Sequence, residues 1–225
     1  MCGVTGFLQS GCITEEEMRA RVARMAHTLL HRGPDGDGVW IDAGAGLALG
    51  FRRLAILDLS PTGQQPMISS DGRYVVVYNG EIYNFPELRA ELEKKGVAFR
   101  GTSDTEVLLE SAACWGFEAA LPRLWGMFAI ALWDRQERIL FLARDRVGKK
   151  PLYYAQAPGA FLFGSELKAL RAHPGFDAAI DRNALAAYVR YGYVPAPHSI
   201  YQVARKLPAA PLYQKELPPN SCTKR

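Results

Sequence analysis

The sequence predicts an α+β fold in which antiparallel sheets are covered by helices. Short runs rich in β-branched and aromatic residues recur along the chain, and tight turns join most of them. Helical patterns fall between groups of these runs and do not alternate with single strands, as a parallel α/β fold would require. No internal repeat or low-complexity segment interrupts this organisation.

The first half of the chain opens with a strand over residues 3–8. Thr14 then begins a capping box, and apolar residues at helical spacing predict a helix over residues 15–30. Turn-forming residues from His31 to Gly38 end this helix. Strands follow over residues 38–42, 46–57 and 73–78, and Tyr78-Asn79-Gly80-Glu81 is expected to interrupt the last one.

The second half alternates between helices and hairpins. A helix is predicted over residues 86–95, and a capping box at Ser103 begins another that reaches about Trp115. Two apolar strands then form a hairpin around the turn Asp134–Glu137. The remaining expectations are strands over 152–156 and 160–164, a boundary near 173–181, a helix from about Asp181, and linker or tail over 192–225.

Length and charge narrow the class of protein. The chain has 225 residues and a net charge of +4, and its basic residues form no block, so nucleic acid is not an expected partner. No uncharged run approaches the roughly 18 residues that cross a bilayer, and the start lacks the pattern of a signal peptide. We therefore expect no membrane association and a cytoplasmic location. The spacing of Cys2, Cys12, Cys114 and Cys222 predicts reduced thiols and neither a disulfide framework nor a metal site.

The first residues carry the strongest chemical signal. Removal of Met1, which a residue as small as cysteine at position 2 permits, would give Cys2 both a thiol and a free α-amine. The two groups titrate near pH 8 to about 8.5, so one residue can supply a nucleophile and its general base. Gly3 and Gly6 would let this strand approach other backbone or a substrate closely. The alternative is an ordinary buried cysteine in an edge strand.

Four further positions could cooperate with Cys2. Asn79-Gly80 is either a plain hairpin turn or an oxyanion hole made by the Asn79 amide and the Gly80 N–H. Arg53 is a solvated strand residue or a grip for a carboxylate, whereas Arg52 points to the opposite face of the strand. Asp104 either favours the positive end of its helix or binds a substrate ammonium group, which Glu81 could assist. Together these groups would suit a small zwitterion with a side-chain amide.

Several motifs together look like the glutaminase half of glutamine-hydrolysing asparagine synthetases. They occur in family order over about residues 2–172 and begin at Met1 (MCGVTG), His31 (HRGPDG), Arg53 (RLAILD), Tyr78 (YNGEIYN), Ser103 (SDTE) and Arg144 (RDRVGKKPLYY). The resemblance implies a class II (type 2) glutamine amidotransferase domain. This domain is an N-terminal-nucleophile (Ntn) hydrolase, a four-layer αββα sandwich of antiparallel sheets.

The resemblance also implies roles for individual residues. Cys2 is the expected nucleophile, and Asn79 and Gly80 form the oxyanion hole. Glutamine would be cleaved through a thioester on Cys2 to glutamate and ammonia, without a cofactor or a metal ion. The expected glutamine-binding residues are Arg53, Leu54, Ala55, Ile56, Leu57, Asn79, Gly80, Glu81 and Asp104.

In the family, ammonia passes to a second domain, where ATP and Mg²⁺ activate aspartate or a related carboxylate. Residues 173–208 resemble a linker and the start of that synthetase domain, and residues 209–225 have no recognisable counterpart. The Ser-Gly-Gly-x-Asp-Ser loop that would bind pyrophosphate does not occur in this sequence. We therefore expect this chain to need a synthetase domain or subunit for amidation. The resemblance leaves a homodimer open.

Two other functions compete with glutamine hydrolysis for aspartate amidation. A non-catalytic remnant of the domain could bind glutamine or a partner protein. An amidotransferase of the same group could serve an acceptor other than aspartate. The related domains of phosphoribosyl or hexosamine amidotransferases match the motif wording less well than the asparagine group does.

Overall fold

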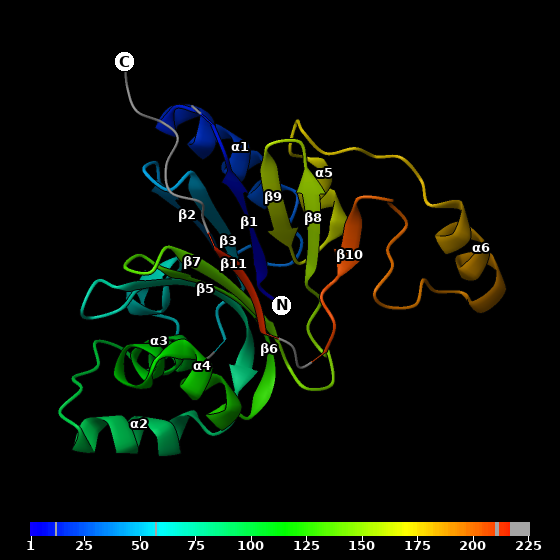
Figure 1. Cartoon of the computed structure of the whole chain (residues 1–225). Helices are drawn as coiled ribbons and strands as arrows, with labels where there is room; N and C mark the ends of the chain where they lie inside the picture. The colour runs from blue at the N-terminus through cyan, green and yellow to red at the C-terminus, as the bar shows by residue number, and fades with distance from the viewer. Residues whose placement is uncertain (12, 57, 210–211, 217–225) are drawn as a thin grey trace.

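Two antiparallel sheets packed face to face, with helices on both outer sides, form the body of the molecule (Figure 1). This computed structural model describes residues 1–11, 13–56, 58–209 and 212–216. The predicted fold class, a four-layer αββα sandwich, is confirmed. No helix in these ranges is long and apolar enough to cross a membrane.

The sheets are built from strands that all pair with antiparallel neighbours. Among the described residues the first sheet has the order β10 (Ala204–Lys206), β8 (Tyr153–Ala157), β9 (Ala160–Gly164), β1 (Gly3–Gln9), β3 (Leu47–Arg53) and β2 (Gly36–Asp42). The second has the order β11 (Leu212–Glu216), β7 (Ile139–Arg144), β6 (Gly126–Asp134), β5 (Tyr74–Ile82) and β4 (Met67–Ile68). The helices are α1 (Glu15–His27), α2 (Phe85–Lys94), α3 (Asp104–Trp115), α4 (Phe117–Ala120), α5 (Leu167–Arg171) and α6 (Arg182–Tyr191), with short 3₁₀ turns at Pro61–Gly63 and Leu121–Arg123.

Three apolar layers hold the sandwich together. The helices α1 and α5 pack on the outer face of the first sheet through a cluster that includes Phe7, Met18 and Val22. The helices α2 and α3 cover the second sheet (Figure 1). Between the sheets lies a third cluster, and Trp133 is its largest fully buried side chain. Figure 1 shows α6 set apart from both sheets.

The two capping boxes differ. Thr14 accepts a hydrogen bond from the Glu17 N–H and the Glu17 carboxylate accepts one from the Thr14 N–H, so the first box is complete. The Ser103 hydroxyl also caps its helix, accepting from the Glu106 N–H. The Glu106 carboxylate, however, accepts from the N–H groups of Arg100 and Gly101. This second box is therefore half formed, and its glutamate holds the preceding loop.

Pairing partners explain two differences from the predicted strands. The strand predicted over 46–57 ends at Arg53, because both neighbours run out there: Gly36 pairs with Arg53 and Gly3 with Arg52. The predicted interruption at Asn79-Gly80 is wrong. Here β5 continues to Ile82, since β6 pairs with it along its whole length, and this long-range pairing overrides the local turn signal.

The chain beyond Gly192, predicted as linker or tail, adds β10 to one sheet and β11 to the other.

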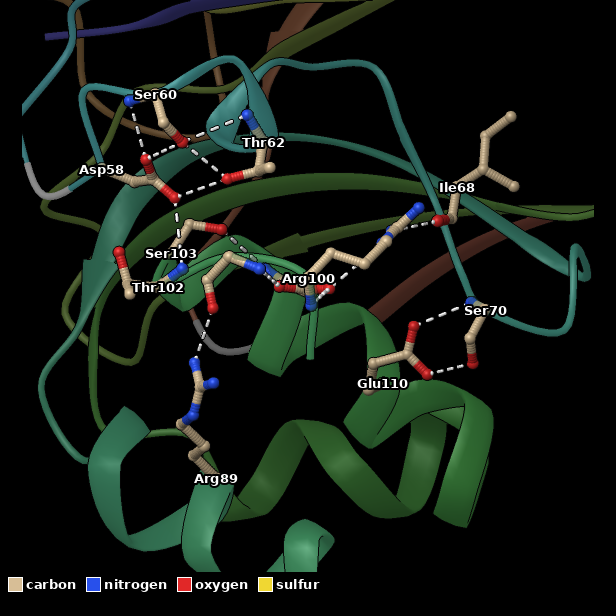
Figure 2. Close-up of polar contacts among 12 residues, drawn as sticks. Asp58, Ser60, Thr62, Ile68, Ser70, Arg89, Arg100, Thr102, Ser103 and Glu110 are labelled. Atoms are coloured by element: carbon tan, nitrogen blue, oxygen red, sulfur yellow. Dashed lines mark hydrogen bonds and ion pairs between the residues drawn. The ribbon is translucent and has the colours of Figure 1, made fainter. Parts of the chain in front are cut away.

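The loop that follows β3 is held by the buried carboxylate of Asp58, which Figure 2 shows among its donors. One oxygen accepts from the Ser60 N–H at 2.8 Å and from the Ser60 hydroxyl at 2.6 Å. The other accepts from the Thr62 hydroxyl at 3.1 Å and from the Thr102 N–H at 3.2 Å. These hydrogen bonds, the Ser60 hydroxyl first, lower the pKa of Asp58 to about 2. Asp58 thus joins the loop to the segment that precedes α3.

A substitution at Gly6 tests how closely β1 packs against its neighbouring strands. A Cβ at this position would lie 2.5 Å from the Ala48 carbonyl oxygen and would overlap the Phe163 ring. We expect Gly6→Ala to lower the free energy of unfolding by about 1–3 kcal/mol, as overpacked cores do. Urea denaturation measures this change. Gly44→Ala, whose Cβ would lie 3.5 Å from Asp42 Oδ1, is the control and should change stability far less.

Asp58→Asn tests the loop anchor through its pH dependence. The pKa of Asp58 is about 2 in the folded chain and about 3.9 when unfolded, so the ionised group stabilises the fold fully above about pH 4. This contribution disappears as the pH falls to about 2. We expect the stability gap between the wild type and Asp58→Asn to narrow over this range in denaturation experiments. A gap independent of pH, or one of equal size for the exposed Asp177→Asn, would contradict the assignment.

Candidate active site

A pocket opens between the two sheets at the end where β1 begins and β3 ends. It contains about 650 Å³ of space not filled by atoms, its mouth included. Both sheets and the start of α3 contribute to its walls. Predicted residues that line it are Cys2, Arg53, Leu54, Ala55, Ile56, Asn79, Gly80, Glu81 and Asp104. Leu57, also predicted, lies outside the described residues.

Strand alternation explains why the pocket gathers these side chains. Successive side chains of a strand point to opposite faces, so alternate residues share one face. Cys2 continues the face of Val4 and Leu8, which pack between the sheets. Arg53 continues the face of Leu49 and Phe51, and Asn79 that of Val75 and Val77. Three segments distant in sequence therefore present their polar ends to one inter-sheet space.

The Cys2 thiol is held by one backbone unit. Its Sγ donates to the Leu54 carbonyl at 3.5 Å and accepts from the Leu54 N–H at 3.4 Å. Burial raises the pKa of the Cys2 thiol, and the hydrogen bond from the Leu54 N–H opposes this increase. The Cys2 carbonyl accepts from Arg32 Nε at 3.0 Å, and Arg32 in turn pairs with Glu166 at 2.9 Å. The sulfur is therefore fixed in position at the pocket wall.

Asn79 offers the pocket an unused hydrogen-bond donor. Its side chain is 1% exposed, and within the described ranges Nδ2 has no hydrogen-bond partner. A buried donor left unpaired is costly, so such a group is typical of a site that a ligand completes. Gly80 beside it leaves no room for a side chain, because a Cβ would overlap the Met127 carbonyl of the neighbouring strand and the Tyr78 ring.

Arg53 lies at the pocket edge, where its Nη2 donates to the Ser60 carbonyl at 3.0 Å and to the Asp58 carbonyl. The loop that Asp58 anchors therefore also orients the guanidinium. No carboxylate of the described residues forms an ion pair with Arg53. Arg52 lies outside the pocket, donating to the Gly33 carbonyl at 3.1 Å and facing Asp37 at 3.5 Å. Of the two arginines, Arg53 lines the pocket and Arg52 does not, and the binding role of Arg53 stays a prediction.

Asp104 supplies a buried carboxylate from the first turn of α3. Its Oδ2 accepts from the Tyr78 hydroxyl at 2.8 Å and from the Ile82 N–H at 2.9 Å. Burial raises the pKa of Asp104, and these hydrogen bonds oppose the increase. Glu81 lines the same pocket from β5. The pocket thus presents the carboxylates of Glu81 and Asp104 and several donor groups to its contents.

Other lining residues were not predicted as site residues. They are Met1, Phe51, Asp58, Gly63, Gln65, Tyr78, Ser103, Thr105, Met127 and Lys150. Gln65 lies beneath the pocket, accepting from the Tyr78 N–H at 2.6 Å and donating to Thr105 at 3.2 Å. Tyr78 and Lys150 lie within the motifs that carry the family resemblance, which was the available signal. Thr105 belongs to the SDTE motif that begins at Ser103, whereas Gln65 has no such signal in the local sequence.

This arrangement suits attack by a thiol on a carbonyl carbon. A sulfur and an unpaired amide donor face the same cavity, and an arginine and two carboxylates can orient a zwitterion there. Within the described part of the chain no group of three or more His, Cys, Asp or Glu residues could hold a metal ion. The roles of the individual residues remain predictions.

Proteins of known sequence support the resemblance stated above. Asparagine synthetase (glutamine-hydrolyzing) 3 of Bacillus subtilis (strain 168) is 43% identical over 188 residues, which are 83% of this chain and 30% of that protein. A putative asparagine synthetase (glutamine-hydrolyzing) of Mycobacterium tuberculosis (strain ATCC 25618 / H37Rv) is 41% identical over 222 residues, covering 92% and 34%. Amidase chry2 of Gibberella zeae is 33% identical over 180 residues, covering 76% and 26%. The chain spans about a third of the length of these relatives.

Solved structures share the fold. The glutamine phosphoribosylpyrophosphate (PRPP) amidotransferase from B. subtilis, complexed with ADP and GMP, superposes with a TM-score of 0.65 at 24% identity. The match covers 76% of this chain and 43% of that one. The family model described as a glutamine amidotransferase domain matches residues 1–221. The chain therefore belongs to the glutamine amidotransferase family.

Proposed function

We propose that this domain hydrolyses glutamine to glutamate and ammonia through a thioester on Cys2. It would act as the ammonia-supplying half of an asparagine synthetase-type amidotransferase. The observation that carries the proposal is that Cys2 Sγ and the unpartnered Asn79 amide line one pocket. Membership of the glutamine amidotransferase family supports the choice of glutamine.

Glutamine would bind by its two charged groups. The Arg53 guanidinium, already oriented by the carbonyls of Asp58 and Ser60, would take the α-carboxylate. Asp104 and Glu81 would take the α-ammonium group. Main-chain atoms of the segment after Arg53 would line the side chain and present its amide carbon to Cys2.

Removal of Met1 is part of the proposal. With Met1 in place, its amine donates to the Arg32 carbonyl at 3.2 Å and the residue lines the pocket. Cleavage would free the α-amine of Cys2, which can then accept the thiol proton. The sulfur would attack the amide carbon, and the Asn79 Nδ2 and Gly80 N–H groups would hold the resulting oxyanion.

The intermediate collapses when the C–N bond breaks and the α-ammonium returns its proton to the leaving nitrogen, which departs as ammonia. A γ-glutamyl thioester remains on Cys2. Water, deprotonated by the α-amine, then adds to the thioester carbon, and the sulfur leaves with a proton. Glutamate is released and the thiol is restored, without a cofactor in either step.

The proposed partner domain and acceptor of the ammonia are based on the relatives of this chain. A synthetase domain or subunit would receive the ammonia, and ATP and Mg²⁺ would act there. The relatives named asparagine synthetase favour aspartate as the acceptor, while the relative named amidase chry2 keeps a different acceptor as the second candidate. We place the protein in the cytoplasm, where Cys2 would stay reduced; a homodimer also remains an expectation.

The first test combines mass and activity. We expect the intact mass to correspond to loss of Met1, and we expect glutamate to form from glutamine with the wild type. Cys2→Ala should reduce this activity to background, because the thioester cannot form. Cys114→Ala, which removes an exposed thiol on α3, is the matched control and should retain activity. Retained Met1 with no glutamate formed would instead favour a glutamine- or partner-binding module.

The second test separates binding from chemistry. Arg53→Ala should raise KM roughly 10- to 100-fold, because it removes a charged hydrogen-bond donor to the substrate. Asn79→Ala should lower kcat by about 10²–10³-fold, the usual cost of losing an oxyanion donor. Steady-state glutaminase kinetics measure both values. Arg52→Ala, on the opposite face of β3, is the control for Arg53, and a reversed pattern would mean that the roles are wrongly assigned.

A further inference from the structure

Lys150 is a cation in the pocket to which the proposed reaction assigns no role. The residue lines the same cavity as Cys2 and Glu81, yet it is only 7% exposed. Among the described residues no hydrogen bond or ion pair engages its ammonium group. A buried charge is costly unless it is paired, so an anion formed during the reaction would stabilise this ammonium group.

The backbone holds Lys150 firmly at this place. Its N–H donates to Asp145 Oδ2 at 3.0 Å, and its carbonyl accepts from Arg144 Nε at 2.5 Å. The Asp145 carboxylate also accepts from the N–H groups of Phe128 and Lys149, at 3.2 and 2.8 Å. The turn after β7 is thereby fixed to β6, the strand that pairs with Asn79 and Gly80.

The anions within reach are few. The Asp145 carboxylate is already used by backbone N–H groups. Arg32, a cation that interacts with Lys150, is paired with Glu166. Burial and Arg32 lower the pKa of Lys150, whereas Glu81 and Cys2 raise it. In the substrate complex we assign Glu81 to the α-ammonium group, which leaves the Cys2 sulfur as the partner.

We propose that Lys150 is a further functional residue of this pocket, whose ammonium group offsets the negative charge that develops on the Cys2 sulfur as the thiol loses its proton. The inference rests on Cys2 being the nucleophile. Lys150 would not contact the reacting atoms of the substrate. It would act through Cys2, by stabilising the charge on the sulfur. The other charged or titratable groups around this pair include the N-terminal amine and a set of side chains: Arg32, Arg53, Asp58, Tyr78, Glu81, Asp104 and Asp145.

Alkylation of Cys2 by iodoacetamide as a function of pH tests this role without substrate. Peptide mass analysis assigns the alkylation to Cys2. Removal of the charge in Lys150→Met or Lys150→Gln should shift the alkylation midpoint up by about one pH unit, the smaller end of the effect of a nearby charge. Lys150→Met keeps an apolar stem for the buried site. Lys150→Arg should restore the midpoint, and kcat for glutamine should fall about tenfold only in the neutral variants.

Lys149→Met is the matched control, because Lys149 is exposed and its N–H donates to the same Asp145 carboxylate. An unchanged midpoint in folded Lys150 variants would overturn the proposal, as would an equal shift in Lys149→Met. A rise in KM alone, with an unchanged kcat, would mean that Lys150 interacts with Glu81 in substrate binding. That result would also overturn the proposal. If Cys2 of the wild type is alkylated as expected but no glutamate forms, the proposed function is wrong. The alkylation midpoints still test the effect of Lys150 on the Cys2 thiol.

Discussion

The site depends on one constraint, the alternation of side chains along strands of two facing sheets. Cys2, Arg53 and Asn79 each extend a row of apolar residues that packs between the sheets. The register that buries those rows also aims the polar residue at the end of each row into the pocket. A slip of one residue in any of the three strands would turn its functional side chain to the opposite face. Core packing and site assembly are therefore one structural requirement.

A second layer of hydrogen bonds fixes what the strands do not. The segment after Arg53 leaves the sheet, yet Asp58 anchors it to the segment that precedes α3 (Figure 2). The same segment returns two carbonyls to the Arg53 guanidinium and one backbone unit to the Cys2 thiol. The Cys2 thiol, the Arg53 guanidinium and the loop that Asp58 anchors therefore hold one another in position. Binding groups arranged before the substrate arrives reduce the entropy lost on binding.

The pocket offers charged groups of both signs to a zwitterion. Arg53 and Lys150 lie in the pocket with the carboxylates of Glu81, Asp104 and the loop-anchoring Asp58, and both cations lack an ion-pair partner among the described residues. Burial raises the pKa of both Cys2 and Asp104, so partial exclusion of water acts on nucleophile and binding group together. A substrate carboxylate and a developing thiolate would each satisfy one cation.

The sequence by itself determined the types of most elements, the fold class and the main candidate site residues. Strand alternation, capping residues and the motifs of the family resemblance are all signals that can be read locally. The hairpin signal at Asn79-Gly80 misled, since pairing with β6 outweighed it. Only the tertiary structure decided that Lys150, Gln65 and Asp58 share the pocket with Cys2. Their contacts join residues distant in sequence, and no local spacing encodes which loop lies over which strand. The unpaired state of the Asn79 amide is likewise a property of its surroundings, which exist only in the folded chain.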